Sequence, residues 1–242
     1  STYEAGENVA VQVATQLKDY LLEGKLSNTI NLPISDMSIL KSISDSLELT
    51  KEIGRLQHPL HKGAIKSFRL SYNGDPEHIQ PLLYSAFEGI MQDRFDGVVN
   101  LINAKSVAES KGISLSTLHD PDLSHVQNVI SVAVESADNV VWELMGYTDI
   151  QGGQRLTKVN HFHVDVLLDG PLIFILNDDV PGVVGVVGTL LANRGINIAE
   201  YSLTRQEGDM ALSLIKCDSQ PGAELLDELK SISSIKECYF LR

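Results

Sequence analysis

The chain has 242 residues, enough for one large domain or two ordinary ones. Its apolar fraction of 43% is that of a folded globular protein, whereas its net charge of −13 argues against nucleic-acid or anionic-membrane partners, because their phosphates would be repelled. No run approaches the roughly 20 apolar residues that span a bilayer, and residues 1–4 do not resemble a signal peptide, so we expect a cytoplasmic protein.

The N-terminal region, residues 1–33, predicts one amphipathic helix and a linker. Val9, Val13, Leu17 and Leu21 recur at helical spacing, and Gly24 supplies a stop before the segment 28–33. A lone helix cannot bury its own apolar stripe. We therefore expect the stripe to pack against another copy of the chain or against the middle region.

The middle region, residues 34–168, predicts a mixed α/β domain of ordinary size. Ser35 or Asp36 caps a long helical pattern over 37–56, and an alternating strand at 65–72 closes at Asn73-Gly74. The pattern then predicts helices at 81–91 and 104–111, a strand at 129–134, and its hairpin partner at 139–148.

The last region, residues 169–242, predicts the order βαββαβ. Strands are expected at 172–176, 196–204, 210–217 and 235–241, helices at 181–193 and 222–232, and a turn at 207–209. This is a ferredoxin-like arrangement, whose usual sheet order is fourth, first, third, second. Cys217 and Cys238 would then lie two strands, roughly 10 Å, apart and form no disulfide. The fold class is α+β.

A small-ligand site is expected where this first helix begins. Asn177, Asp179 and Asn197 are predicted to cluster there, Pro181 suits a first helical turn, and Gly182 allows close backbone approach. Free amides at a helix start attract a carboxylate, Asp179 can accept an ammonium group, and the asparagines can donate or accept. A carboxylate together with an ammonium group indicates an amino acid.

Simpler explanations exist for each of these residues. Asp179 could cap the helix and Asn197 could tolerate a bend, while Gly182, Gly185 and Gly188 could let the helix lie close on the sheet. A dinucleotide site is not expected, because the tight Gly-x-Gly phosphate turn is absent.

A second candidate site is a run of basic residues without an acid. If residues 155–163 form a strand, Arg155, His161 and His163 share one face and, with Lys158, could hold an anion such as phosphate. A solvated edge strand is the alternative. No further ligand for a metal is in evidence beside the two histidines.

Nothing in the chain suggests a catalytic group. There is no Gly-x-Ser-x-Gly elbow, no nucleophile with a base, and no paired carboxylates in an apolar setting. The remaining histidines are expected at the surface: His58, His61, His78, His119 and His125.

These patterns resemble known families over the whole chain. The stretches 177–183 and 195–199 are similar to an ACT domain, the amino-acid-sensing module of metabolic enzymes. The opening residues 1–13 with 28–33 resemble the segment that closes the catalytic part of the D-3-phosphoglycerate dehydrogenase family. Residues 52–56, 99–104 and 111–113 resemble the allosteric substrate-binding domain of its longer members.

The resemblance implies a regulatory part without catalytic residues. The family's catalytic histidine and NAD-binding domain would lie upstream, so this chain holds no cofactor, whereas the parent enzyme of serine biosynthesis uses NAD. Regulatory parts of serine dehydratases and of other ACT-regulated enzymes are the alternative. An iron–sulfur dehydratase would need cysteines that this chain lacks.

The resemblance also assigns roles to individual residues. Asp179 matches the position that holds the ammonium group of L-serine, and Asn197 the position that contacts the ligand from the neighbouring subunit, in a homodimer or tetramer. Asn177 departs from the His or Tyr of relatives. Arg155 and His163 resemble positions of an anion site for phosphate or a phosphorylated hydroxy acid. The full set expected at the effector site is Asn177, Asp179, Val180, Pro181, Gly182, Val183, Asn197 and Ile198, and that expected at the anion site is Arg155, Lys158, His161 and His163.

Overall fold

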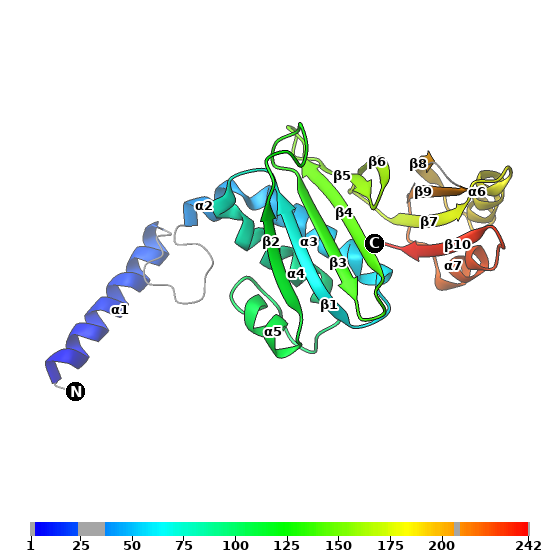
Figure 1. Ribbon diagram of the computed structural model, residues 1–242. Helices are drawn as coiled ribbons and strands as arrows, with labels where there is room; N and C mark the ends of the chain where they lie inside the picture. Colours follow the sequence, from blue (N-terminus) through cyan, green and yellow to red (C-terminus); the bar gives the residue numbers. More distant parts are fainter. Residues whose placement is uncertain (1–2, 24–36, 206–208, 242) are drawn as a thin grey trace.

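The computed structural model describes residues 3–23, 37–205 and 209–241, and contains two β-sheets preceded by a separate helix (Figure 1). Three predictions fall outside the described residues: the stop at Gly24 with the segment 28–33, the cap at Ser35 or Asp36, and most of the turn at 207–209. None of the described helices is long and apolar enough to cross a bilayer.

The N-terminal helix α1 (Tyr3–Glu23) forms where its periodicity predicts. Its stripe does not pack on the middle region: Val9, Val13 and Leu17 are 59%, 56% and 58% exposed. That part of the prediction is wrong, because α1 shares no surface with the sheets (Figure 1). Burial against another copy remains a prediction.

The first sheet has the strand order β2-β1-β3-β4-β5-β6. Its strands are β1 (Ile65–Tyr72), β2 (Ser114–His119), β3 (Ile130–Ser136), β4 (Val141–Thr148), β5 (Gln154–Val159) and β6 (Phe162–Leu167). Alternating residues such as Phe68, Leu70 and Val132 are fully buried in the core beneath the helices. The predicted strands at 65–72 and 129–134 and the hairpin with 139–148 are confirmed within two residues.

The helices of this region are α2 (Met37–Ser42), α3 (Ser44–Gln57), α4 (Ile79–Met91) and α5 (Ala104–Ser110), with short 3-10 turns η1 (His58–Leu60) and η2 (Pro76–His78). The predicted helix 37–56 is interrupted at Ile43. Strand β2, which runs parallel to β1, was not predicted, because its side chains are mostly polar and exposed and carry no apolar alternation.

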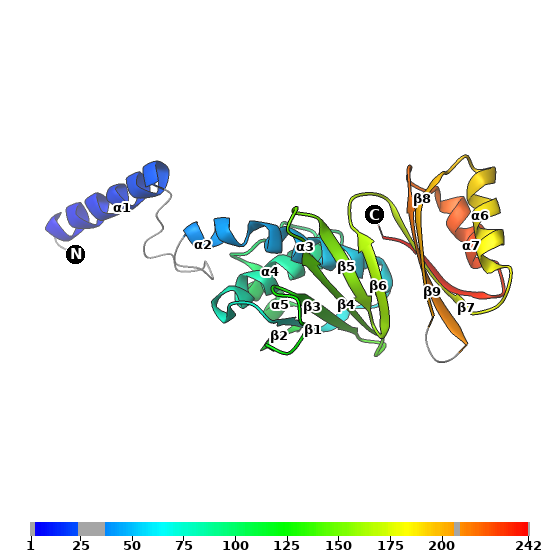
Figure 2. The same ribbon diagram turned by 90° about the horizontal axis from the view of Figure 1, so that it is seen from above.

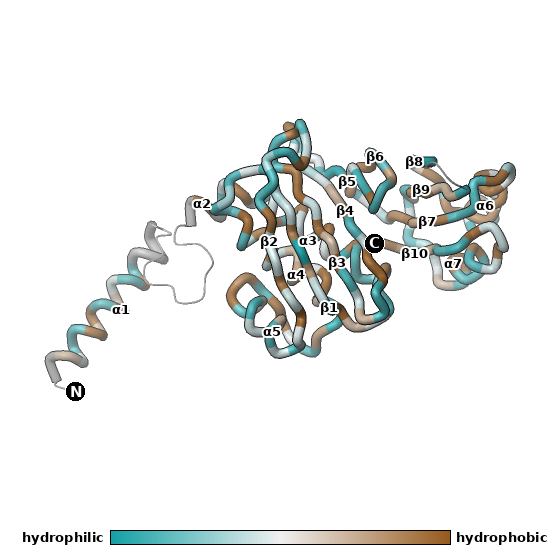
Figure 3. Tube along the Cα trace, viewed as in Figure 1, coloured by the Kyte–Doolittle hydropathy of each residue, from teal (hydrophilic) through white to brown (hydrophobic). Residues whose placement is uncertain are grey.

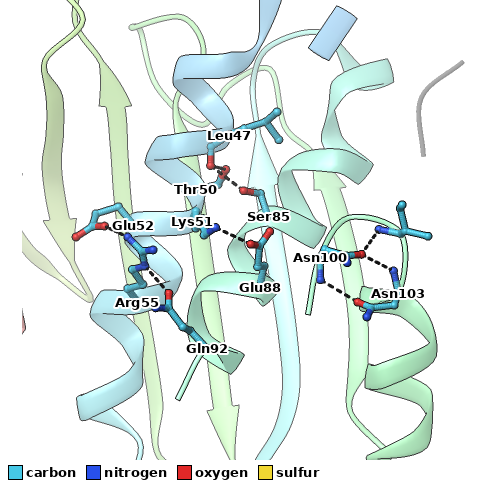
Figure 4. Close-up of polar contacts among 11 residues, drawn as sticks. Leu47, Thr50, Lys51, Glu52, Arg55, Ser85, Glu88, Gln92, Asn100 and Asn103 are labelled. Carbon is cyan, nitrogen blue, oxygen red and sulfur yellow. Dashed lines mark hydrogen bonds and ion pairs between the residues drawn. The ribbon is translucent and has the colours of Figure 1, made fainter. Parts of the chain in front are cut away.

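Helices α3 and α4 cross at close range through two glycines. A Cβ atom on Gly54 would overlap the carbonyl oxygen of Ala86, and one on Gly89 would overlap that of Lys51. Polar contacts line the crossing: the Ser85 hydroxyl donates to Leu47 O at 2.7 Å, Lys51 pairs with Glu88 at 2.5 Å, and Arg55 Nε donates to Gln92 at 2.9 Å (Figure 4). The backbones can touch because these positions lack side-chain bulk.

The second sheet has the order β10-β7-β9-β8. Its strands are β7 (Leu172–Asp178), β8 (Ile198–Arg205), β9 (Met210–Cys217) and β10 (Ile235–Phe240). Helices α6 (Val183–Asn193) and α7 (Ala223–Lys230) cover one face, on the side away from the first sheet (Figure 2). The predicted ferredoxin-like order is confirmed, and Cys217 and Cys238 are buried free thiols.

The other face of the second sheet packs on the first region. Along β7, Ile173 and Ile175 belong to the core beneath α6 and α7, whereas Leu172 and Phe174 belong to the core of the first sheet. Phe174 contacts Trp142 edge-to-face, with ring centroids 5.4 Å apart. The two sheets therefore share one continuous apolar core.

Candidate functional site

The loop between β7 and α6 holds most of the predicted effector residues. Gly182 is the N-cap of α6 with a φ of +98°, a left-handed conformation that glycine adopts without strain. The helix consequently opens at Val183, two residues later than predicted, and Pro181 lies in the turn before it. No side chain caps the helix, so the alternative role of Asp179 as a helix cap is wrong.

Asn177 is the buried polar group of this site. It is 3% exposed and follows Ile173 and Ile175 on the face of β7 that the helices cover. Its Nδ2 donates to Asp178 O at 2.8 Å, while its Oδ1 has no hydrogen-bond partner. Leaving a buried acceptor without a donor costs about 1–3 kcal/mol, which a donor on a ligand would recover.

Asp179 is held by two contacts from the neighbouring hairpin. Its backbone N–H donates to Asp209 O at 2.8 Å, and its Oδ1 lies 3.1 Å from Nε of Arg205. Arg205, at the end of β8, is a site residue that sequence reasoning missed. The sequence offers no signal for it, because the contact depends on the register between β8 and β9.

Asn197 lies at the opposite end of the sheet, which corrects the expected cluster. Asn197 directly precedes β8, so the eight-residue strand from Ile198 to Arg205 separates it from the Asp179 end by roughly 26 Å. Its Nδ2 donates to Asp218 at 2.7 Å. Within one chain, Asn197 and Ile198 therefore cannot meet Asn177 and Asp179, and they could complete that site only from a second copy.

The glycines of α6 do not serve close packing on the sheet. A Cβ on Gly185 or Gly188 would meet no atom within 4 Å, so the packing explanation is wrong. Val180 before the helix, and Val184 and Val186 within it, are 45–49% exposed, and α6 is largely hydrophobic along its length (Figure 3). These exposed valines are open to a ligand or to a second chain.

The basic residues of the second candidate site form a hairpin in place of the single expected strand. Lys158 in β5 pairs with His163 in β6, and His161 lies in the turn between the strands. Arg155 is held between two acids outside the run, Asp149 at 3.5 Å and Asp165 at 2.9 Å. The positive charge of Arg155 is thus already compensated, which weakens this site for an anion.

A cleft of about 570 Å³ lies next to this hairpin, between α3 and the β4–β5 turn. Acids and bases alternate along its α3 wall, where Glu48, Lys51, Glu52 and Arg55 lie, and Asp169 adds another carboxylate. Lys51 and Arg55 are both paired. The cleft therefore offers no net positive charge to an anion. No group of three His, Cys, Asp or Glu side chains in the described part of the chain is arranged to hold a metal ion.

One histidine is misplaced by the sequence-based expectation. His61 is 1% exposed, where a surface residue was expected. Its Nε2 lies 3.2 Å from Gln57 Oε1 and its Nδ1 3.1 Å from the Ser136 hydroxyl. Burial, with the nearby Arg94 guanidinium, lowers the pKa of His61 to about 4.

Comparison with known proteins identifies the middle of the chain. Residues 42–160 match the D-3-phosphoglycerate dehydrogenase intervening domain. The chain contains a D-3-phosphoglycerate dehydrogenase intervening domain. The matched residues include strands β1 to β5 of the first sheet and helices α3, α4 and α5, and they end in the turn before β6.

Relatives of the whole chain carry the same name. The chain is 30% identical over 261 residues to D-3-phosphoglycerate dehydrogenase 2, chloroplastic, of Arabidopsis thaliana, covering 100% of this chain and 42% of that protein. It is 28% identical to the D-3-phosphoglycerate dehydrogenases of Synechocystis sp. and Bacillus subtilis. These matches cover 100% of this chain and 44% of the Synechocystis protein, and 97% of this chain and 45% of the Bacillus protein. The chain thus spans less than half the length of these relatives.

Proposed function

We propose that this chain is the effector-binding regulatory part of a D-3-phosphoglycerate dehydrogenase and that L-serine binds between the C-terminal domains (residues 169–242) of two copies. The intervening-domain match and the relatives support the parent enzyme. The NAD-dependent chemistry belongs to a part of the parent outside these 242 residues. Residues 1–33 are then the terminal helix and linker of the catalytic part, and residues 34–168 the intervening region.

The observation that carries the effector proposal is the position of the expected site residues at two ends of one sheet. Asn177, Asp179 and the start of α6 lie at one end, where we propose the first half of the site, and Asn197 lies at the far end, where we propose the second. Two copies related by a twofold axis, with their sheets side by side, would bring unlike halves together. A bridging ligand would favour one interface geometry and so shift the parent enzyme between activity states.

Two other functions are less well supported: regulation of a serine dehydratase and binding of an anion at the β5–β6 hairpin. A serine dehydratase regulatory part finds less support, because the matched domain and the relatives named above are of the dehydrogenase. Anion binding at Arg155, Lys158, His161 and His163 is not part of the proposal, since Arg155 is paired with two carboxylates.

Calorimetry of the whole chain with L-serine, glycine and L-threonine tests the proposal. We expect saturable binding of L-serine and its loss in Asp179→Ala, because the ammonium group then has no carboxylate partner. Asp227→Ala, which removes an acid from α7 and leaves the β7–α6 loop unchanged, is the matched control and should bind normally. Absence of heat with every amino acid would refute the sensor function.

A further inference from the structure

We propose that Arg205 binds the carboxylate of the amino acid whose ammonium group Asp179 holds, so that the ion pair between these residues opens to accept a zwitterion. The inference rests on the proposed effector function and assigns a second charged residue to the same site. Its basis is the 3.1 Å contact between Arg205 Nε and Asp179 Oδ1.

Strand register places Arg205 in the site and not merely near it. Arg205 on β8 and Asn177 on β7 are both direct neighbours of Ala211 on β9. Adjacent strands are about 4.8 Å apart, so Arg205 and Asn177 lie roughly 10 Å apart on the same face of the sheet. That face carries α6, because Tyr201, four residues before Arg205, packs against the core beneath the helices.

The small side chain of Ala211 lies between the two larger residues. Ala211 is buried in the middle of this cross-strand row, and Asp179 contacts the Arg205 end of the row through the ion pair. The row supplies a cation at one end and the partnerless Asn177 Oδ1 at the other. The buried acceptor is an independent sign that a donor from a ligand is missing here.

The charges of the row match those of a free amino acid. A zwitterion carries an ammonium group and a carboxylate on the same carbon, and the Asp179–Arg205 pair presents the complementary two charges in contact. Arg205 is 67% exposed and Asp179 28%, so the pair is one of the exposed kind that contributes little to stability. A ligand can therefore separate it, with Asp179 and Asn177 facing the ammonium group while Arg205 and the α6 start face the carboxylate.

Three ligands distinguish two roles for Arg205. It could bind the carboxylate of the ligand, or it could only compete with the ligand's ammonium group for Asp179. The full chain and its Arg205→Gln variant are titrated calorimetrically with L-serine, with L-serinamide, which lacks the carboxylate, and with D-glycerate, which lacks the ammonium group. We expect Arg205→Gln to weaken L-serine about tenfold, as for loss of a charged hydrogen bond. L-Serinamide should bind the variant as well as or better than the wild type, because Asp179 is freed. D-Glycerate should bind the wild type weakly and the variant more weakly still.

Lys236→Gln is the matched control. Lys236 pairs with Asp178 at 2.6 Å at the same end of the same sheet, so the variant removes an equal charge from a neighbouring ion pair. Its affinity for L-serine should stay within twofold of the wild type. Arg205→Lys should recover part of the lost affinity, because a charge is restored without the planar fork.

Two results would overturn the inference while leaving the effector function intact: an unchanged L-serine affinity in Arg205→Gln, or a tighter one, which would make Arg205 only a competitor of the ammonium group. An equal loss in Lys236→Gln would also overturn it, since the effect would then be one of overall charge. No binding of any amino acid to the wild-type chain would remove the effector function and this inference together.

Discussion

At the residue scale, His61 shows how a buried network sets a pH limit on stability. The Gln57 amide donates to the carbonyl oxygens of Val132 and Trp142, so its Oε1 accepts from His61 Nε2. The Ser136 hydroxyl, whose oxygen lies 3.1 Å from His61 Nδ1, donates its own proton to Asp138 Oδ1 at 2.6 Å. Protonation would place a charge in the core beside Arg94, and the exposed Asp138 would favour that charge only in part.

Acidification should therefore destabilise the chain through His61. The folded-state pKa of about 4 lies below the unfolded value of 6.5, so the unfolded state takes up the proton first. Stability from this group is complete above pH 6.5 and is lost as the pH falls toward 4, by roughly 3 kcal/mol in total. Urea unfolding at pH 7 and pH 4 measures the loss. His61→Gln cannot titrate, and an equal loss in that variant would contradict the prediction.

At the scale of elements, the crossing of α3 and α4 depends on the absence of two Cβ atoms. Gly54→Ala would force a methyl group against the Ala86 carbonyl, and the helices would have to separate. We expect a destabilisation of roughly 1–3 kcal/mol, as for other overpacked cores, in spite of alanine's better helix propensity.

Gly185→Ala in α6 is the matched comparison, because its new methyl group would meet no atom within 4 Å. Helix propensity alone then predicts a gain of about 0.5–1 kcal/mol. Denaturant unfolding of both variants measures the change in the free energy of unfolding, which should be negative for Gly54→Ala and positive for Gly185→Ala. Two equal changes would show that backbone entropy outweighs contact at the crossing.

At the scale of the whole molecule, a site divided between two copies predicts complementation. Asp179→Ala and Asn197→Ala chains should each bind no L-serine as homodimers. Each mixed dimer, however, contains one intact site and one doubly altered site. Calorimetry after co-refolding at equal amounts should recover roughly a quarter of the wild-type stoichiometry, because half of the dimers are mixed. A site contained within one chain would recover none.

The patterns that could be predicted from sequence are local ones. The apolar runs of β7 and β9 and the Pro-Gly pair before α6 predicted the βαββαβ order, because each feature depends on residues close in the chain. Strand β2 was not predicted, because it is exposed and largely polar. The burial of His61 depends on Gln57 and the distant Ser136 together.

The candidate site was predicted in its residues but not in its geometry. Asp179 and Asn177 lie at the predicted helix start, yet the placement of Asn197 required the length and direction of β8. Arg205 and the acids that pair with Arg155 are contacts across strands, and register decides them. Periodicity within one strand contains no information about its partner's offset.

The shared core has a consequence for how the C-terminal domain could be transplanted. Leu172, Phe174, Leu212 and Leu214 of the second sheet are buried against the intervening domain, with Trp142 on the other side. A C-terminal domain cut free before β7 would expose this apolar face to water, with a tendency to aggregate. Gene fusions designed on the proposed effector function would have to move the intervening domain and the C-terminal domain together.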